Sequence, residues 1–200
     1  MKIFSNFVVL FNSNNMNYSL LTILGIVVLL VIIITLIYNK LIKLKNLMQE
    51  AWSAIDVFLK KRHDLIPNLV EIVKGYAAHE KSTLEDLTRF RSEAMQAKDQ
   101  ASRMESENNL GKALSQFFVV VENYPTLKAN ANFLDLQHQL ADIENELAMA
   151  RRYYNGTVRI NNIYIERFPS NLIANIFHFV KGEFFTTNEN EKTVPDVSFQ

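Results

Sequence analysis

A long uninterrupted run of apolar residues stands near the start of the chain. The run "LLTILGIVVLLVIIITLIY" covers residues 20–38, and no ionisable side chain lies between Lys2 and Lys40. At about 1.5 Å per residue, a helix over this run is roughly 28 Å long, close to the hydrocarbon thickness of a bilayer, about 30 Å. Its Leu, Ile and Val residues favour insertion by about 5–9 kcal/mol. The pattern therefore predicts a transmembrane helix, with residues 20–38 in contact with the lipid bilayer.

Apolar positions continue beyond the run, now in steps of three and four, which is the spacing of a buried helical stripe. No glycine or proline occurs between Ile26 and Ile66. We therefore expect the membrane helix to continue into a soluble domain, to about Arg62. The stripe consists of Leu41, Leu44, Met48, Ala51, Ile55 and Phe58, widened by Trp52 and Leu59.

Pro67 interrupts this pattern, and a proline inside a helix costs roughly 3 kcal/mol. Asp64 is a good N-cap, and Pro67 then falls in a first turn, where its missing amide has no intrahelical partner. The prediction is that one helix ends near His63 and another begins near Asp64. A single kinked helix is the alternative.

The remaining chain predicts further helices. A segment with Ser82 or Thr83 as its cap is predicted to form a helix or to extend the preceding one. The polar segment 98–109 is predicted as a loop, and residues 110–124 are predicted as a helix ended by Pro125. A stripe at three-four spacing then continues to Pro169, followed by a short closing helix with Ser170 as its cap. The stripe comprises Phe133, Leu136, Leu140, Ile143, Leu147, Ala150, Tyr154, Val158, Asn161, Ile165 and Phe168.

Together these elements predict an all-α fold, an N-terminal transmembrane helix continuous with an elongated antiparallel four-helix bundle. The expected division is a short N-terminal tail over residues 1–18, the transmembrane helix over 19–39, the bundle over 40–180 and a flexible tail over 181–200. Met16 is an alternative start. No small-residue cleavage site follows the apolar run, so we expect the anchor to be retained.

Charge and composition narrow the classes of function. Lys and Arg number 21, Asp and Glu also 21, and cysteine is absent. The balanced charge gives no reason to expect binding to nucleic acid, and the lack of cysteine excludes disulfides and thiolate catalysis. Lys40, Lys43 and Lys45 follow the span, so the positive-inside rule places the C-terminal domain in the cytoplasm.

Residues that carry chemistry are few. A di-iron centre in a bundle needs two acid-x-x-His pairs, and Asp135–His138 is the single match, explained by a solvated helix face. His63 and His79 lie at expected helix junctions, where capping is the usual role. We therefore predict no catalytic, cofactor-binding or metal-binding residue, and no cofactor.

Three groups of residues are candidate contacts. The lysines after the span would meet anionic headgroups or act as an ordinary stop signal. Lys60, Lys61 and Arg62 would complement a helix dipole or dock an acidic partner. The apolar segment "SNLIANIFHFVKGEFF" would cap the bundle end or contact a partner or the membrane surface. Its candidate residues are Phe177, Phe179, Phe184 and Phe185.

Four segments together resemble the bacterial LemA family. They are "YNKLIKLKN", "AWSAIDVFLKKRHDLIPNLVEIVKGYAAHEKSTLE", "NYPTLKANANFLDLQHQLADIENELAMARRYYN" and "RFPSNLIANIFHF". The resemblance implies a single N-terminal membrane helix, a LemA-like helical bundle over 40–180, and a location in the bacterial inner or plasma membrane. The chain departs from the family pattern at Gly156, which replaces an acidic residue, and at Asn161 on the inner stripe.

The expected function is that of a single-pass, membrane-anchored scaffold or adaptor without enzymatic activity, which binds protein partners. One alternative is a self-assembling, membrane-organising protein that forms homo-oligomers. A metal-dependent enzyme with a site in the bundle is the other.

Overall fold

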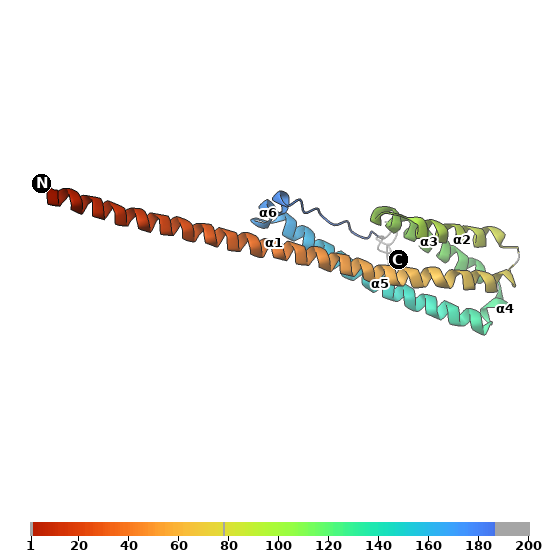
Figure 1. Cartoon of the computed structure of the whole chain (residues 1–200). Helices are drawn as coiled ribbons and strands as arrows, with labels where there is room; N and C mark the ends of the chain where they lie inside the picture. The colour runs from red at the N-terminus through yellow and green to blue at the C-terminus, as the bar shows by residue number, and fades with distance from the viewer. Residues whose placement is uncertain (1, 78, 187–200) are drawn as a thin grey trace, which may run out of the picture. The chain divides into compact units, whose positions relative to one another are not determined.

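The structure, a computed structural model, describes residues 2–77 and 79–186, with side chains from residue 18 onward. All regular secondary structure in these ranges is helical, which confirms the all-α prediction (Figure 1). The helices are α1 (Lys2–Lys74), α2 (Lys81–Gln96), α3 (Gln100–Val121), α4 (Pro125–Lys128), α5 (Ala131–Glu166) and α6 (Ser170–Ile176). The short helix α4 was not predicted.

The chain divides into two compact units. The first contains residues up to Asn46 together with Asn161–Lys181, and the second contains Leu47–Ile160 together with the chain from Gly182. Helices α1 and α5 each contribute to both units. The predicted domain boundaries themselves stay a prediction.

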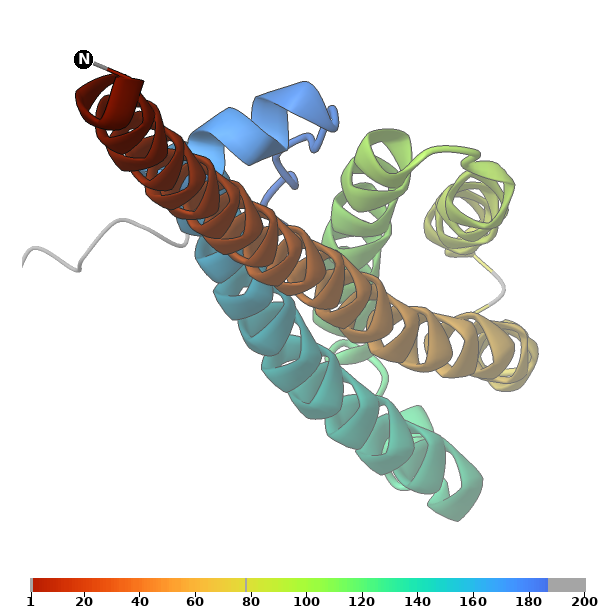
Figure 2. The same cartoon turned by 60° about the vertical axis from the view of Figure 1, so that its left-hand side comes forward.

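The second unit is the antiparallel four-helix bundle. Its four long segments, from α1, α2, α3 and α5, alternate in direction along the chain (Figures 1 and 2). One core cluster joins all four helices, and its members include Leu69, Leu87, Leu110, Phe117 and Phe133. A second cluster contains Ala51, Ile55, Leu59, Met104, Leu147, Tyr154, Val158 and Phe185. In the second cluster, the residues from α1 and α5 belong to the apolar stripes that the sequence predicts for these helices, whereas Met104 and Phe185 do not.

The first unit contains the candidate membrane span. One helix in the described part of the chain, near the N-terminus, is long and apolar enough to cross a membrane. The side chains of its span lie on the surface instead of in a core, as expected of a helix that faces lipid. Beyond the span, Leu41 packs with Ile165, Ile173 and Ala174 in a small cluster that holds α6 beside α1.

Helix α1 runs through Pro67 to Lys74, so the predicted break near His63 is wrong and the continuous alternative holds. Pro67 lacks the amide hydrogen that would bond to the carbonyl four residues earlier, which is that of His63. Arg91 of α2 fills this vacancy, because its Nε donates to the His63 oxygen at 2.7 Å. A tertiary hydrogen bond thus replaces the missing helical one.

The loop predicted over 98–109 is also wrong, because α3 begins at Gln100. Asp99 caps this helix, with its carboxylate accepting from the Ser102 amide at 2.8 Å. The segment shows no apolar period since two of its inward positions are Met104 and the charged Glu107, both buried. Because a charged residue occupies an inward position, the apolar spacing of the sequence does not indicate this helix.

The long stripe of α5 is confirmed at every position except Phe168. Helix α5 ends at Glu166, so Phe168 lies past it, 77% exposed. Ser170 begins α6 but does not cap it: its hydroxyl donates to the carbonyls of Tyr164 and Arg167 near the end of α5.

The structure describes part of each segment that the sequence predicts as a tail. Residues 2–18 belong to helix α1. Residues 182–186 pack on the second unit, with the amide and carbonyl of Phe185 bonded to the Asn155 side chain at 2.8 and 2.9 Å. Gly182 allows this approach, because a Cβ there would overlap the Met48 sulfur. Residues 187–200 of the predicted flexible tail lie outside the described residues.

Candidate functional site: a buried charge cluster beside a groove

The second unit buries a group of charged side chains between α1, α3 and α5. Arg62 and Glu107 are 1% and 0% exposed. The Arg62 guanidinium donates to the Glu107 carboxylate and, at 3.3 Å, to the Glu107 backbone oxygen. Its second terminal nitrogen donates to Glu144 Oε1 at 2.9 Å. One cation therefore joins two carboxylates from different helices.

His63 completes the cluster from the next position on α1. Its Nε2 lies 2.8 Å from Glu107 Oε1, an ion-pair distance when the imidazole is protonated. Consecutive residues on a helix point about 100° apart, so Arg62 and His63 reach Glu107 from two directions. Each oxygen of this carboxylate has its own cationic or imidazole neighbour. Both oxygens of the Glu107 carboxylate thus lie against side chains of α1.

Burial and charge act in opposite directions on these groups. Burial raises the pKa of Glu107, but contact with His63 and the charge of Arg62 outweigh it, so the pKa lies below its ordinary value. Burial lowers the pKa of Arg62, and the carboxylates of Glu144 and Glu107 more than offset this. Both groups therefore stay ionised in the folded chain.

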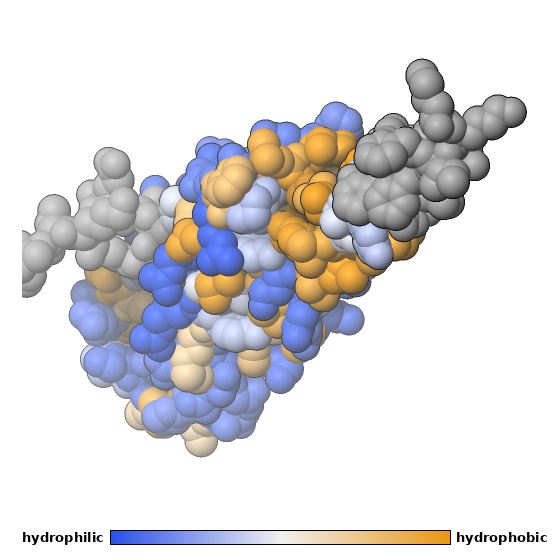
Figure 3. Space-filling view, turned by 90° about the vertical axis from the view of Figure 1, so that its left-hand side faces the viewer, coloured by the Kyte–Doolittle hydropathy of each residue, from blue (hydrophilic) through white to orange (hydrophobic). Residues whose placement is uncertain are grey.

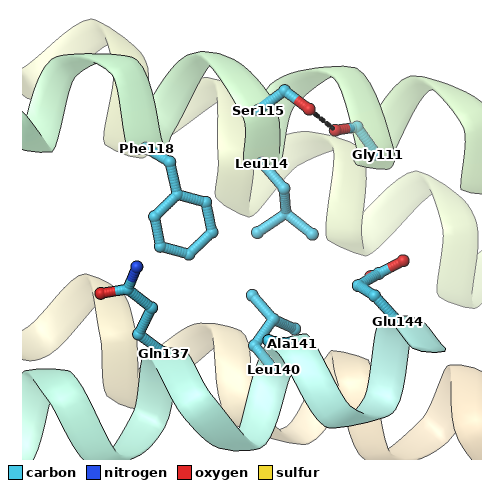
Figure 4. A pocket seen from close by; sticks show the side chains of 8 residues that line it. All are labelled: Gly111, Leu114, Ser115, Phe118, Gln137, Leu140, Ala141 and Glu144. Atoms are coloured by element: carbon cyan, nitrogen blue, oxygen red, sulfur yellow. Dashed lines mark hydrogen bonds between the residues drawn. The ribbon is translucent and has the colours of Figure 1, made fainter. Parts of the chain in front are cut away.

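A groove lies beside this cluster, between α3 and α5 (Figure 4). Its volume is about 270 Å³. Leu114 and Phe118 of α3 face Leu140 of α5 across an apolar floor, and the Glu144 carboxylate stands at one end. The Glu144 side chain is half-exposed, so the same carboxylate faces the groove and bonds to Arg62. An apolar side chain with a neighbouring cation would fit this surface.

The predicted cationic contacts divide into exposed and buried residues. Lys40, Lys43, Lys45, Lys60 and Lys61 are exposed. Arg62 is not, which corrects its place in the predicted docking patch. It cannot meet an external partner, because Glu107 and Glu144 hold its guanidinium inside the bundle.

The predicted aromatic contacts divide in the same way. Phe177 and Phe184 are about half-exposed, and Phe179 is partly buried against Tyr38. Phe185 is buried, which corrects its place among the contact candidates. Its ring lies 6.1 Å from that of Trp52, with the Arg151 guanidinium 4.3 Å above its face.

The Asp135–His138 pair, half of a possible metal site, has no further metal ligands beside it among the described residues. Asp135 and His138 are both exposed on α5, and the Asp135 carboxylate accepts from Gln139 at 2.8 Å. Among the described residues, no group of three or more His, Asp or Glu side chains is placed to hold a metal ion.

Sequence reasoning missed Glu107 and Glu144 as partners of Arg62. Glu107 lies in the segment expected as a loop, so no inward face was assigned to it. The available signal was "KKRHD", where Arg62 continues the three-four spacing after Phe58 or Leu59. A cation on an apolar stripe indicates that a buried carboxylate must exist elsewhere in the fold.

Comparison with known proteins identifies the family. The sequence model described as "LemA family" matches residues 51–199, most of the chain. The chain belongs to the LemA family. The matched range covers the bundle, including Arg62, Glu107, Glu144 and the groove between α3 and α5.

Individual relatives of this LemA family chain are distant. Magnetosome protein MamQ 2 of Paramagnetospirillum magneticum is 25% identical over 174 residues, covering 74% of this chain and 64% of the relative. Magnetosome protein MamQ of Magnetospirillum gryphiswaldense is 23% identical with the same coverage. Protein LemA of Metamycoplasma hominis is 26% identical over 161 residues, covering 80% of this chain and 74% of the relative. The chain thus spans about two-thirds or less of the magnetosome relatives' length.

Family and structure together suggest a membrane-anchored protein. The family relatives are bacterial, and the described chain has one candidate span near its N-terminus.

Proposed function

We propose that this chain is a single-pass, membrane-anchored scaffold that binds protein partners through its helical bundle and has no catalytic activity of its own. The observation that carries the proposal is helix α1. One unbroken helix, Lys2–Lys74, contains both the candidate membrane span and the first helix of the bundle. Such a helix ties whatever the bundle binds to the bilayer.

The charge cluster supports a structural role for the bundle core. Arg62 and Glu107 form an ion pair, His63 contacts the same carboxylate, and all three side chains are buried away from any substrate. Buried ion pairs of this kind add little net stability but specify which surfaces meet, as a hypothesis for this bundle. The cluster would fix the register of α3 against α1 and so hold the groove beside it.

The groove between α3 and α5 is the proposed contact surface. Its floor is apolar, and Glu144 gives it one negative end. A partner helix that inserts an apolar side chain, with a Lys or Arg one turn away, would match both features. The relatives named for magnetosomes are too distant to assign this chain to that structure.

The proposed location of the bundle is the cytoplasm. The three lysines directly after the span outnumber Lys2 before it, and cations favour the cytoplasmic side. The test uses Val119→Cys, since the chain has no cysteine and Val119 is exposed on α3. A membrane-impermeant maleimide should label it only after cells are permeabilised. Labelling in intact cells would place the bundle outside.

Photocrosslinking tests the scaffold. A benzophenone amino acid at Gln137, which lines the groove, is compared with one at Gln139, an exposed residue two positions further along α5. We expect an adduct of defined mass at position 137 and little at 139, identified by mass spectrometry from cells that express the full chain.

Other outcomes discriminate between the alternatives. An adduct at 137 with the mass of two copies of this chain would favour the self-assembling protein. Equal adducts at 137 and 139, or none at either, would contradict a groove-directed scaffold. Stoichiometric iron, manganese or zinc in the purified full chain would favour the enzyme.

A further inference from the structure

The outer face of α6 is apolar, although it is exposed in the first unit. Ile173 and Ala174 point inward and are buried. Leu172 and Ile176, four residues apart on the other side of α6, are exposed, Ile176 at 66%, and Phe168 before the helix is exposed too. A surface helix of a soluble domain normally carries polar residues on that side. The helix α6 and its flanks therefore expose several apolar side chains, next to the exposed Asn175.

The end of α6 adds further apolar surface. His178 has a φ of 54°, and the Phe179 amide bonds to the Ala174 carbonyl at 2.9 Å, the pattern that reverses the chain after a helix. This turn directs Phe179 inward against α1 and leaves Phe177 and Val180 on the outside. Val180 is 80% exposed.

This face lies at the end of the membrane span, within the same compact unit. The Tyr38 ring, at the last position of the apolar run, lies 4.8 Å from the Phe177 ring and 5.8 Å from that of Phe179. Figures 1 and 2 both show α6 alongside α1. Viewed from the N-terminal side, the molecule shows a connected area of hydrophobic residues (Figure 3). If Leu20–Tyr38 spans the hydrocarbon, α6 is level with one headgroup region.

The charges around this face fit an anionic membrane surface. Residues 37–46 and 161–181 contain one carboxylate, Glu166, which pairs with Lys181. No acidic residue occurs between Arg167 and Lys181. The cations of the two segments are Lys40, Lys43, Lys45, Arg167 and Lys181, and each cation near an anionic bilayer contributes about 1 kcal/mol in general.

We propose that α6 is a second membrane contact, lying in the interface of the bilayer with Phe168, Leu172, Ile176, Phe177 and Val180 among the lipid chains and headgroups. Amphipathic segments bind in this way, with the apolar face about 5–10 Å deep at the boundary between headgroups and acyl chains. Aromatic residues are enriched at that depth. The inference rests on the proposed membrane anchoring, which it extends from one contact to two.

The test measures the depth of single labels in the full chain, reconstituted into phosphatidylcholine–phosphatidylglycerol vesicles. The cysteine-free sequence allows a nitroxide at Ile176→Cys, and power-saturation EPR compares its accessibility to oxygen and to a nickel chelate. The matched control is Val119→Cys, which is 66% exposed in the structure, as Ile176 is. A label at Ile26→Cys reports on the span itself.

We expect position 176 to favour oxygen over the nickel chelate by several-fold, whereas position 119 favours the chelate. Water-like values at 176 with bilayer values at 26 would overturn the interfacial contact and leave the anchor intact. Shielding of 176 from both reagents would overturn it too, because a protein partner would then cover α6. Water-like values at 26 would refute the anchor, and with it the proposed function.

Discussion

At the scale of single residues, substitutions in the buried pair of Arg62 and Glu107 are expected to change the free energy of unfolding most. Both side chains are removed from water, and each compensates the charge of the other. Removing one partner leaves the second charge buried without compensation, which is far more costly than the net value of the intact pair. Loss of the half-exposed Glu144 carboxylate costs less, because water can replace its contact with Arg62.

Glu107→Gln should therefore lower the free energy of unfolding by on the order of 3 kcal/mol. Glu144→Gln is the control, with an expected loss of about 1 kcal/mol or less. Trp52 is the only tryptophan and packs in the core, 5.3 Å from the Tyr154 ring. Its fluorescence in urea titrations of the detergent-solubilised chain measures both variants. Equal losses would show that Glu107 is no more critical than the rim carboxylate.

The same pair predicts how stability depends on pH. The pKa of Glu107 is lower in the folded chain than its ordinary value, so its contribution is complete above about pH 4.3 and is lost as the pH falls through the lower folded-state pKa. The stability difference between the wild type and Glu107→Gln should narrow as the pH falls below about 4.3. A difference that stays constant in acid would contradict the ionised pair.

A substitution at Gly156 is expected to stabilise the chain. This glycine lies inside α5, and a Cβ at this position would meet no heavy atom within 4 Å. Gly156→Ala should raise the free energy of unfolding by about 1 kcal/mol, because alanine loses less backbone entropy and packs against nothing new. The urea midpoint of Trp52 fluorescence measures this change. A lower midpoint would mean that α5 needs a glycine there.

At the scale of elements, the continuity of α1 past Pro67 depends on a hydrogen bond from α2. Pro67 has no amide hydrogen to donate to the His63 carbonyl within the helix. Arg91 of α2 donates a hydrogen bond to this carbonyl instead. A carbonyl left without a partner in this buried place would cost about 1–3 kcal/mol. The continuity of α1 thus depends on its packing with α2.

A double-mutant cycle tests this dependence. Arg91→Ala alone should destabilise the bundle by about 1–3 kcal/mol. In the Pro67→Ala background the same change should cost much less, because the alanine amide can donate to the His63 carbonyl. Equal costs in the two backgrounds, measured by urea titration, would show that the two residues are not coupled.

The segment 182–186 provides a second test at this scale. Asn155 makes two hydrogen bonds to the backbone of Phe185, whereas the partly buried Asn108 makes one, to Thr186 at 3.1 Å. Asn155→Ala should accelerate hydrogen exchange of the Phe185 amide at least tenfold, and Asn108→Ala should change it little. Unchanged exchange in Asn155→Ala would mean that the Phe185 ring alone holds the segment.

The sequence predicts those elements whose residues carry a local apolar period. The stripes of α1 and α5, and the apolar span, follow from spacing alone. Pro67 was misinterpreted because the donor that rescues its helix lies on α2, far along the chain. The start of α3 was missed because Glu107 occupies a core position, and Phe185 because one buried ring leaves no period. Long-range polar contacts, including the whole charge cluster, have no local pattern.

At the scale of the whole molecule, the proposal depends on one span in the bilayer. The apolar run of α1 is exposed on the surface of its unit and is followed by lysines, and its last residue, Tyr38, contacts the ring of Phe177 just after α6. Lipid is the environment in which such a surface is stable. The scaffold function and the interfacial contact of α6 both require that this span is inserted.

The most direct measurement is alkaline carbonate extraction of membranes from cells that express the full chain. The comparison is the triple variant Val27→Asp, Val31→Asp, Ile34→Asp, whose three carboxylates oppose insertion by about 9 kcal/mol. We predict that the wild-type chain stays in the membrane pellet and that the triple variant moves to the supernatant. Release of the wild-type chain by carbonate would contradict the membrane anchor.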